Sequence, residues 1–263
     1  MLVKRAMSKN VVSVSVPGNR EKVLDLMRKE DKAVLPVVKG DTKQLVGLIT
    51  RSDLIVNPDE EQIAILMSTD LVTASPDDDV KDVAKKMIDN NVRRVPVVDD
   101  NGDLVGIITS FDLVSNALIK LESDDPVENF MITTVPTTWY KTPLNVAFET
   151  MKQFGLKSVL ALNDSAKLVG ILTETDFIEE SEIISERSEH SSTVGTEGDK
   201  WSWDSTSVLY IEKNCLKFTD KLVEDVGTHK VEVVNSKTKA SDCAKKMKTL
   251  NICLLYTSDA ADE

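Results

Sequence analysis

The stretch that decides the fold is a ten-residue phrase that returns three times. It reads LVGLITRSDL at 45–54, LVGIITSFDL at 104–113 and LVGILTETDF at 168–177. Each copy is an apolar run that contains a Gly, ends on a Thr and carries an Asp three residues later. We predict a strand that turns directly into a helix, because Thr is a good first cap for a helical turn. This junction, here called the Thr-x-x-Asp joint, brings a hydroxyl, backbone N–H groups and a carboxylate onto one small surface.

The same interval extends beyond the phrase, so the chain is built from repeats. The Asp of the joint recurs at Asp53, Asp112 and Asp176, at intervals of 59 and 64 residues. A Met of the predicted helix recurs at Met27, Met87 and Met151, at intervals of 60 and 64 residues. Self-similarity at about sixty residues sets the architecture, because each unit must bury its apolar face against a neighbour.

Each unit predicts the same order of elements: strand, helix, two strands and a second helix. The predicted first strands are Val11–Val14, Leu71–Ala74 and Thr134–Thr137, and the predicted helices are Arg20–Lys29, Asp79–Asp89 and Leu144–Gln153. In the second unit the polar run Asp99–Asp103 is a strong signal for a hairpin between the last two strands. We therefore expect an α+β fold of β-α-β-β-α units.

A fourth unit begins near the end of the sequence, with a predicted strand at Val231–Val234 and a predicted helix at Ala240–Leu250. We expect this unit to be truncated. The final stretch 253–263, CLLYTSDAADE, has no hydrophobic period and resembles the translation of a sequencing-library adapter. We interpret it as a read-through artefact outside the fold, with a genuine acidic tail as the alternative.

The segment 181–207 is rich in Ser, Glu, Thr and Gly and reads as a mobile linker. After it, Val208–Ile211 and Leu216–Phe218 predict a small hairpin, and Trp201 and Trp203 predict that this insertion packs against the body. The expected division of the chain is 1–60, 61–123 and 124–182 for three repeats, 183–222 for the insertion, 223–252 for the partial fourth repeat and 253–263 for the tail.

Composition narrows the function classes. The net charge of −12 argues against a nucleic-acid partner that binds through broad electrostatics. Two His and three Cys without metal-like spacing give no zinc site and no His-based catalytic centre, and suit a reducing cytoplasm. We found no signal peptide and no apolar run long enough to span a bilayer, so we expect a cytoplasmic protein without a membrane partner.

The joint itself has two interpretations. In the first, Thr and Asp only cap the helix, each with an effect of about 1 kcal/mol or less. In the second, the short Asp carboxylate accepts hydrogen bonds from a ribose, while the Thr hydroxyl and the first helical N–H groups face a phosphate. Capping does not require Asp over the longer Glu, which a capping box usually prefers.

These motifs resemble the CBS domain, the module named after cystathionine β-synthase. The resemblance is carried by the joint, by the leads MSKNVVS at 7–13 and MSTDLVT at 67–73, and by the strand Val95–Val98, echoed at 35–38. It covers nearly all of residues 1–252 except the insertion. The resemblance implies that repeats pair in tandem into Bateman modules, as in archaeal stand-alone four-repeat proteins and the γ subunit of AMP-activated protein kinase. It further implies a sensor of AMP, ADP, ATP or S-adenosylmethionine. The modules would pair either between the two chains of a homodimer or within one chain. The sensor would act on an unknown regulated protein.

The resemblance also implies the binding residues. An adenine would lie between the early strand and the V-P-V strand, basic side chains would face the phosphates, and the joints would hold the ribose. The residues so assigned are Thr73, Ala74, Arg93, Arg94, Val95, Pro96, Thr109 and Asp112 in the second repeat, Thr50, Arg51 and Asp53 in the first, and Thr173 and Asp176 in the third. The third repeat departs from the pattern, because its strand lacks the Pro and its joint encloses Glu174, which would repel a polyphosphate.

Three functions compete. A non-catalytic ligand sensor is our main prediction, and a scaffold with empty clefts that mediates dimerisation or partner binding is the alternative. An enzyme is disfavoured, because the sequence supplies neither a catalytic barrel nor an acid–base histidine.

Overall fold

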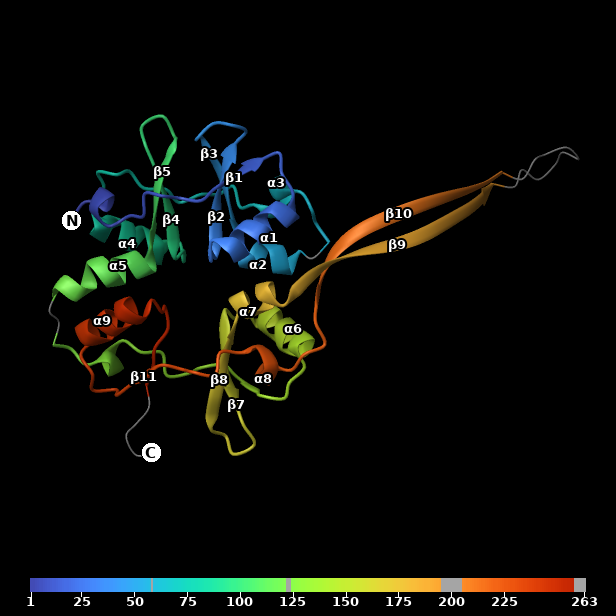
Figure 1. The fold of residues 1–263 in the computed structure, drawn as a ribbon. Helices are drawn as coiled ribbons and strands as arrows, with labels where there is room; N and C mark the ends of the chain where they lie inside the picture. Colours follow the sequence, from blue (N-terminus) through green and yellow to red (C-terminus); the bar gives the residue numbers. More distant parts are fainter. Residues whose placement is uncertain (58, 122–123, 195–204, 258–263) are drawn as a thin grey trace, which may run out of the picture.

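The computed structural model describes residues 1–57, 59–121, 124–194 and 205–257. For the described residues between 184 and 216 it describes the backbone only. The first repeat shows how a unit is built (Figure 1). Strand β1 (Val14–Val16) runs parallel to β2 (Val34–Lys39), and β3 (Leu45–Thr50) pairs antiparallel with β2. Helix α1 (Arg20–Lys29) begins where the Asn19 side chain accepts a hydrogen bond from the Lys22 amide, and α2 (Arg51–Val56) follows β3 directly.

The other repeats reproduce this order, which confirms the predicted α+β fold of β-α-β-β-α units. The second repeat contains α4 (Val80–Asp89), β4 (Arg94–Val98), β5 (Leu104–Thr109) and α5 (Ser110–Asn116), followed by a 3-10 turn at Leu118–Leu121. The third contains β6 (Thr137–Trp139), α6 (Leu144–Phe154), β7 (Ser158–Leu162), β8 (Leu168–Thr173) and α7 (Glu174–Glu179). The fourth contains β11 (Val233–Val234), α9 (Ala240–Leu250) and β12 (Tyr256–Thr257).

The predicted first strands lie too early in the sequence. In the first repeat the ladder starts at Val14, where the prediction ended, and in the third it starts at Thr137. In the second repeat the strand is reduced to a single bridge between Ala74 and Val97. The residues before these points have a high β-propensity, but only the last residue of each predicted strand pairs with the following strand, β2, β4 or β7.

Each repeat is completed by a short lead that belongs, in sequence, to its partner. Residues 1–8, with a 3-10 turn at Val3–Arg5, pack on the second repeat, while 61–68, with α3 (Ile63–Leu66), pack on the first. Residues 125–131, with a 3-10 turn at Val127–Asn129, pack on the fourth repeat, and 221–228, with α8 (Val223–Val226), pack on the third. This reciprocal exchange ties repeats one and two, and three and four, into the two expected pairs.

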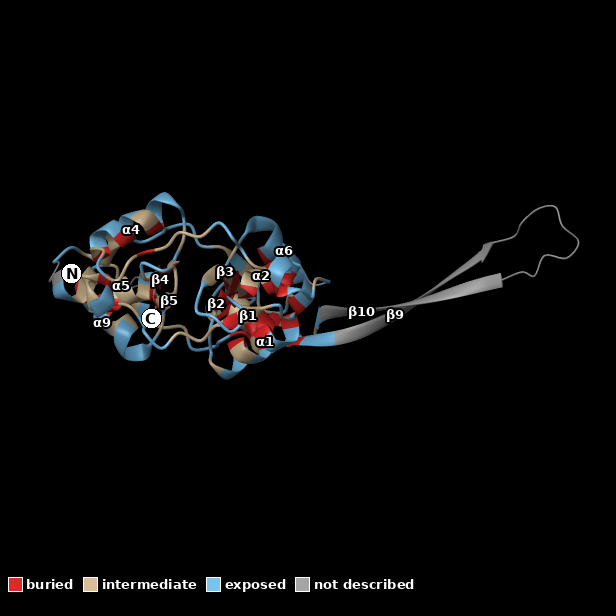
Figure 2. Ribbon diagram, turned by 90° about the horizontal axis from the view of Figure 1, so that it is seen from above, coloured by how far each residue is buried: buried red, intermediate tan, exposed pale blue. Residues whose placement is uncertain are grey.

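Most of the buried apolar residues form two clusters, and the larger one does not follow this pairing (Figure 2). One cluster joins the first repeat to the third, and includes Leu24, Met27 and Leu54 together with Phe148 and Phe177. The other contains the second repeat and the lead of the first. The two modules therefore share a core through their first members.

The insertion after the third repeat is a long antiparallel hairpin that extends away from the body (Figure 1). Strand β9 (Ser181–Val194) pairs with β10 (Ser205–Phe218) along all fourteen residues of each. The predicted small hairpin is wrong, because Val208–Ile211 and Leu216–Phe218 lie on the same strand, and 181–194 is a strand rather than a linker. Trp201 and Trp203, which we expected to pack on the body, lie outside the described residues.

Two residues of the predicted tail pair with the fourth repeat. Tyr256 and Thr257 pair in parallel with β11, in the same relation as β2 to β1, so these two residues belong to the sheet of the fourth repeat. Residues 258–263 lie outside the described part of the chain.

Candidate functional site

Each Thr-x-x-Asp joint folds its Asp back onto its own Thr. In the second repeat, Asp112 Oδ2 accepts hydrogen bonds from the Thr109 amide at 2.8 Å and from the Thr109 hydroxyl at 2.6 Å. The Asp112 amide donates to Thr109 Oγ1 at 3.1 Å. The joints of the first and third repeats form the same capping box. At every joint the Thr hydroxyl hydrogen and one carboxylate oxygen of the Asp are therefore already engaged in hydrogen bonds of the cap.

The second carboxylate oxygen is different. Within the described residues, no hydrogen bond reaches Oδ1 of Asp53, whose Oδ2 accepts from the amide and the hydroxyl of Thr50, both at 2.7 Å. The same holds for Oδ1 of Asp112, and both Asp side chains are half-buried. An ionised carboxylate has acceptor sites on both oxygens, so these two joints retain an acceptor for a ligand after the cap has formed.

The helix amides are mostly occupied. The first amide of α5, on Ser110, donates to the carbonyl of Arg93 at 2.9 Å, and the first amide of α2, on Arg51, donates to Ala33 at 3.2 Å. The third amide donates to the capping Thr. At most one amide per joint is left for an anion, so a phosphate here would depend on side-chain cations.

The third joint is the most buried. Asp176 is 8% exposed, and Thr173 donates to its Oδ2 through the amide at 2.6 Å and through the hydroxyl at 2.8 Å. Burial raises the pKa of Asp176, while the hydrogen bonds from Thr173 and the charge of Arg51 oppose that rise. This joint is less open to a ligand than the other two.

The second repeat places several of its predicted residues around the β4–β5 hairpin. Arg94 pairs in register with Thr109 at the open end of the β4–β5 hairpin, opposite the turn. Ala74 lies beside Val97 and is held by two backbone hydrogen bonds, from its amide to the Pro96 carbonyl and from the Val98 amide to its carbonyl, each 3.0 Å long. The early segment, the V-P-V strand and the start of the joint therefore lie next to one another in this repeat. The Thr73 carbonyl accepts a hydrogen bond from Lys86 at 3.3 Å, so it is already engaged.

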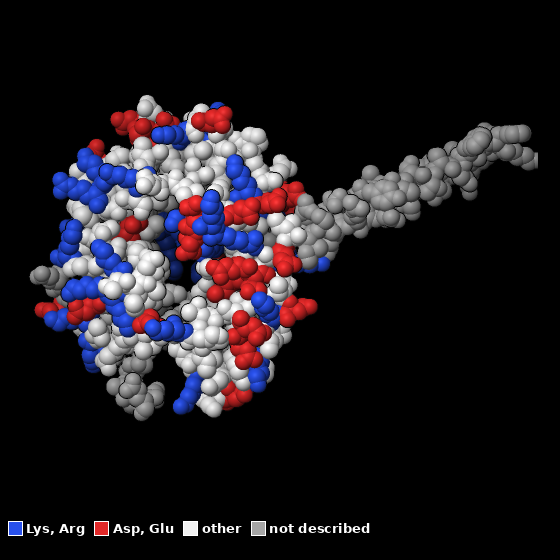
Figure 3. Space-filling model, viewed as in Figure 1, with Lys and Arg blue, Asp and Glu red and all other residues white. Residues whose placement is uncertain are grey.

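Charged residues of several repeats act on Arg94. Its side chain is half-buried, and burial lowers the pKa of its guanidinium; the charge of Glu174 opposes this shift, and Arg51 and Arg93 add to it. Residues of three different repeats thus act on one guanidinium. A recess near the middle of the face in Figure 3 shows Lys or Arg atoms at its bottom, between the two modules.

Arg51 crosses from the first repeat to the third. It is 7% exposed, its guanidinium donates to the Thr175 hydroxyl, and it forms an ion pair with Asp31 at 3.2 Å. Its Nε is buried and has no hydrogen-bond partner among the described residues. A buried guanidinium N–H without a partner is unfavourable, and an anion that reached it would relieve that cost.

The residues between Thr and Asp in the first and third joints touch each other. Lys157 Nζ lies 2.9 Å from Glu174 Oε1, and the same Glu174 oxygen accepts a hydrogen bond from the Ser52 hydroxyl. Glu174, predicted to repel a phosphate in its own repeat, is therefore paired at the contact between modules. Sequence reasoning missed Ser52, because no local pattern indicates a partner 122 residues away.

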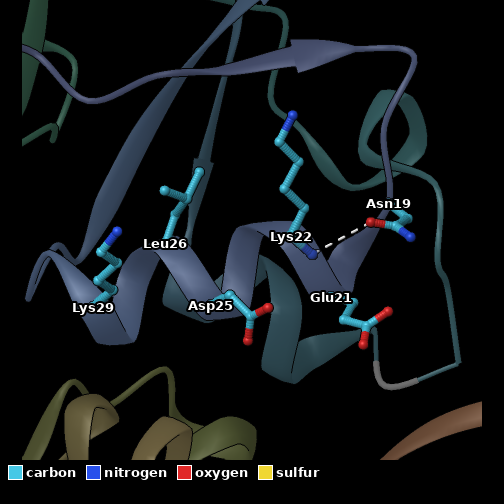
Figure 4. A pocket seen from close by; sticks show the side chains of 6 residues that line it. All are labelled: Asn19, Glu21, Lys22, Asp25, Leu26 and Lys29. Carbon is cyan, nitrogen blue, oxygen red and sulfur yellow. Dashed lines mark hydrogen bonds between the residues drawn. The ribbon is translucent and has the colours of Figure 1, made fainter.

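Two hollows are described on the surface, and neither touches Thr109 or Asp112. The larger, of about 330 Å³, follows the exposed face of α1 and is lined by charged and polar side chains such as Lys22 and Asp25, which point in different directions (Figure 4). The smaller, of about 40 Å³, lies where α2 meets α6 and α7, beside Ser52, Phe148 and Glu174.

The described ranges show neither a metal site nor a membrane helix. No group of three or more His, Cys, Asp or Glu side chains is close enough to hold a metal ion in this part of the chain. None of the helices there combines the length and the apolar character that a membrane crossing requires.

Comparison with known proteins identifies the repeats. A family model of the CBS domain matches residues 3–58, 61–118 and 127–182. The uncharacterized protein MJ1426 of Methanocaldococcus jannaschii is 32% identical over 152 residues, which cover 43% of this chain and 89% of that protein. The uncharacterized protein MJ1225 of the same organism is 23% identical over 197 residues, or 67% of this chain and 70% of that protein.

Two solved structures share the overall arrangement. The crystal structure of MJ1225, described as a candidate archaeal homologue of g-AMPK, superposes with a TM-score of 0.77 at 19% identity and covers 99% of this chain and 94% of that one. An uncharacterized conserved protein from Pyrococcus horikoshii superposes with a TM-score of 0.61 at 24% identity, over 99% and 92% of the two chains. At these identities the likeness concerns the fold.

Proposed function

The chain belongs to the family of CBS-domain proteins, and from this premise we propose that it is a non-catalytic regulatory module that binds an adenine nucleotide at the second repeat. AMP, ADP and ATP are the expected ligands of this site. S-adenosylmethionine, which carries no phosphate, fits the charge of the site less well.

The observation that carries the proposal is the position of Arg94. In a protein of net charge −12, a half-buried guanidinium stands in register with the joint threonine, with Arg93 beside it in sequence and Arg51 close enough to affect its pKa. Clustered guanidinium groups repel one another, so an arrangement of this kind favours an anion between them.

The joint would hold the sugar. Asp112 Oδ1 remains an acceptor after the capping box has formed, and ribose hydroxyls are donors of matching chemistry. The base would lie against Ala74 and Pro96, which are buried next to each other where the early segment bridges β4. Thr73, Val95 and Arg93 complete the proposed site in this repeat.

The first and third repeats would contribute differently. Thr50 and Asp53 keep a free carboxylate oxygen, so the first joint is a second candidate site, with Arg51 beside it. Thr173 and Asp176 form the most buried joint, next to Glu174, and we propose that it binds a weakly charged adenosyl ligand or none.

Binding would act on the contact between modules. Arg51 belongs to a proposed phosphate site and also donates to Thr175 of the third repeat. An anion that draws the Arg51 guanidinium toward Arg94 would weaken or redirect this contact, which provides a route from ligand binding to module packing.

The test is isothermal titration calorimetry of the 263-residue chain with AMP, ADP, ATP and S-adenosylmethionine. We expect at least one nucleotide to bind below millimolar concentration and to stabilise the chain by about 2.7 kcal/mol at a hundredfold excess over its dissociation constant. Asp112→Asn keeps an oxygen that can cap Thr109 but loses the free carboxylate acceptor, so it should weaken binding at least tenfold.

The matched control is Asp225→Asn. Asp225 Oδ2 accepts the Leu222 amide at 2.9 Å at the start of α8, which is the same kind of cap outside any Thr-x-x-Asp joint. This variant should bind as the parent chain does. If no ligand produces heat or a thermal shift at millimolar concentration, the sensor is rejected and the scaffold with empty clefts takes its place.

A further inference from the structure

Two aromatic rings and a carboxylate meet at the end of the third repeat that lies away from its joint. Trp139 ends strand β6, Tyr140 follows it, and Asp164 lies in the turn between β7 and β8. Asp164 Oδ1 accepts a hydrogen bond from Trp139 Nε1 at 2.9 Å, and its Oδ2 accepts one from the Tyr140 hydroxyl at 3.1 Å. One carboxylate therefore fixes both rings, whose centroids lie 5.8 Å apart with their planes at 89°.

The corner between the two rings holds a cation. Lys141 Nζ lies over both rings, 4.9 Å from the centroid of Tyr140 and 5.9 Å from that of Trp139. The same ammonium is 3.9 Å from Asp164 Oδ2. The face of an aromatic ring attracts a cation at these distances, and several such faces together bind ammonium groups in proteins. The corner therefore has the chemistry of a cation site.

The charges around the corner also favour a cation. The hydrogen bond from Trp139, followed by that from Tyr140 and the charge of Lys141, lowers the pKa of Asp164 and keeps this carboxylate ionised. A hydrogen bond with Tyr140 raises the pKa of Lys141, and the charges of Asp164 and Glu224 add to the rise. Glu224 belongs to α8, and its amide donates to the Tyr140 carbonyl at 2.8 Å. Negative charge from two separate segments therefore acts on the corner.

The repeat fold does not require this pair of rings. By the register with the following strand, the place of Trp139 is held by Ser15 in the first repeat and by Ser75 in the second. Tyr140 packs in part against the larger apolar cluster, as Val16 does in the first repeat. Trp139 is 50% exposed and belongs to neither cluster. Core packing thus accounts for part of Tyr140 but not for Trp139.

Lys141 does not close the corner. Its side chain is 43% exposed, and its distance to Asp164 is too long for a hydrogen bond. The Lys ammonium is strongly hydrated and sits on a flexible stem, so it can leave the rings for water. An ammonium whose hydrogens are replaced by methyl groups keeps the charge but donates no hydrogen bond to water. Such a cation gives up less hydration between the rings than Lys141 does.

We propose that the corner formed by Trp139, Tyr140 and Asp164 is a binding site for a small organic cation that carries a trimethylammonium group. The ligand displaces the Lys141 ammonium into solvent and lies against the faces of both rings, with Asp164 as its counter-ion. This site lies in the third repeat and shares no residue with the proposed nucleotide site, so the two proposals stand or fall separately.

The experiment titrates the 263-residue chain with tetramethylammonium chloride and with choline, and follows the indole N–H signal of Trp139 by NMR. Trp139→Ser identifies this signal by its loss, and the variant should fold because two other repeats carry Ser at this place. We expect a saturable shift of the signal with both cations. The neutral carbon analogue of choline, which has the same shape without the charge, should give no saturable shift.

Two further variants test the roles of the charges, with calorimetry as the readout. Lys141→Gln removes the competing ammonium and should tighten binding by about threefold or more, whereas Asp164→Asn removes the counter-ion and should weaken it roughly tenfold. Absence of a saturable shift, an equal response to the neutral analogue, or unchanged binding in Lys141→Gln would overturn the proposal. So would binding of a trimethyl-lysine peptide alone, because the ligand would then be a polypeptide.

Discussion

Each joint uses its carboxylate asymmetrically. One oxygen of Asp112 satisfies both the amide and the hydroxyl of Thr109, while the other stays available. The short Asp side chain stays close to the helix start, so its second oxygen is held near the joint. The choice of Asp over Glu at all three joints is therefore compatible with a cap and with a ligand acceptor at once.

Asp176 leads to a prediction about pH. Its folded-state pKa is raised above the ordinary value of 3.8 by burial, so the folded chain holds this proton more tightly than the unfolded chain does. The sign follows from linkage: the contribution of Asp176 to the free energy of unfolding is largest below pH 3.8 and falls as pH rises through the raised pKa. Asn imitates the protonated form. We therefore expect the stability of Asp176→Asn, relative to the parent chain, to increase across that window and then level off.

Urea unfolding from pH 3 to pH 7 (a range of about four units around the ordinary carboxyl pKa) measures this difference. Asp225→Asn, at an exposed cap, serves as the reference substitution. A relative stability of Asp176→Asn that stays constant or decreases with pH would mean that the carboxyl is not desolvated in solution.

At the scale of elements, each exchanged lead packs against the partner repeat and not against its own. Met7 lies at the start of the chain but packs against Gly106 of β5, whose Cβ position lies 2.5 Å from its sulfur. The contact joins segments that are about a hundred residues apart, and it is repeated by Met67 on Gly47.

This contact predicts a coupling between two substitutions. Gly106→Ala should destabilise the chain by about 1–3 kcal/mol, because the new methyl group overpacks against Met7 and the Ser8 carbonyl. Met7→Ala in the same chain should recover part of the loss, with a coupling energy of about 0.5 kcal/mol or more. Chemical denaturation of the two single variants and the double variant gives the cycle. Additive effects would show that the lead does not occupy this position.

At the scale of the whole molecule, the pairing of repeats and the pairing of cores differ. Backbone exchange joins repeat one with two and repeat three with four, whereas the largest apolar cluster joins repeat one with three. Arg28 reinforces that second contact by donating to the carbonyl of Ile178 at 2.8 Å. The modules are consequently coupled through an interior and not only through surface polar groups.

Because the first and third repeats share a core, a substitution in that core should change hydrogen exchange in one part of the first module more than in the other. Phe177 is buried, and its ring contacts those of Phe148 and Phe218. Phe177→Ala should cost about 3–5 kcal/mol and should reduce protection in α1 and β2 of the first repeat more than in β4 and β5 of the second.

Met87→Ala is the matched substitution in the other cluster, and it should reduce protection in β4, β5 and the lead around Val3. The two variants thus have opposite expected patterns. A uniform loss of protection over both modules, from either variant, would contradict a division of the core into two clusters.

The sequence alone determined the local parts of this protein. The interval of about sixty residues predicted the units and their helices closely, because apolar periodicity and caps act within a few turns of chain. The capping pairs could also be predicted from the sequence, because a Thr at the cap position and an Asp three residues later lie close together at the start of a helix.

Tertiary structure decided which units touch. Exchange of leads, the contact of Arg51 with Thr175 across 124 residues, and the single long hairpin from 181 to 218 depend on which surfaces are buried together. Sequence periodicity is the same for every repeat, so it cannot distinguish a contact between the first and second units from one between the first and third. Burial of the shared apolar face, which depends on the complementary surface of a distant unit, makes that choice.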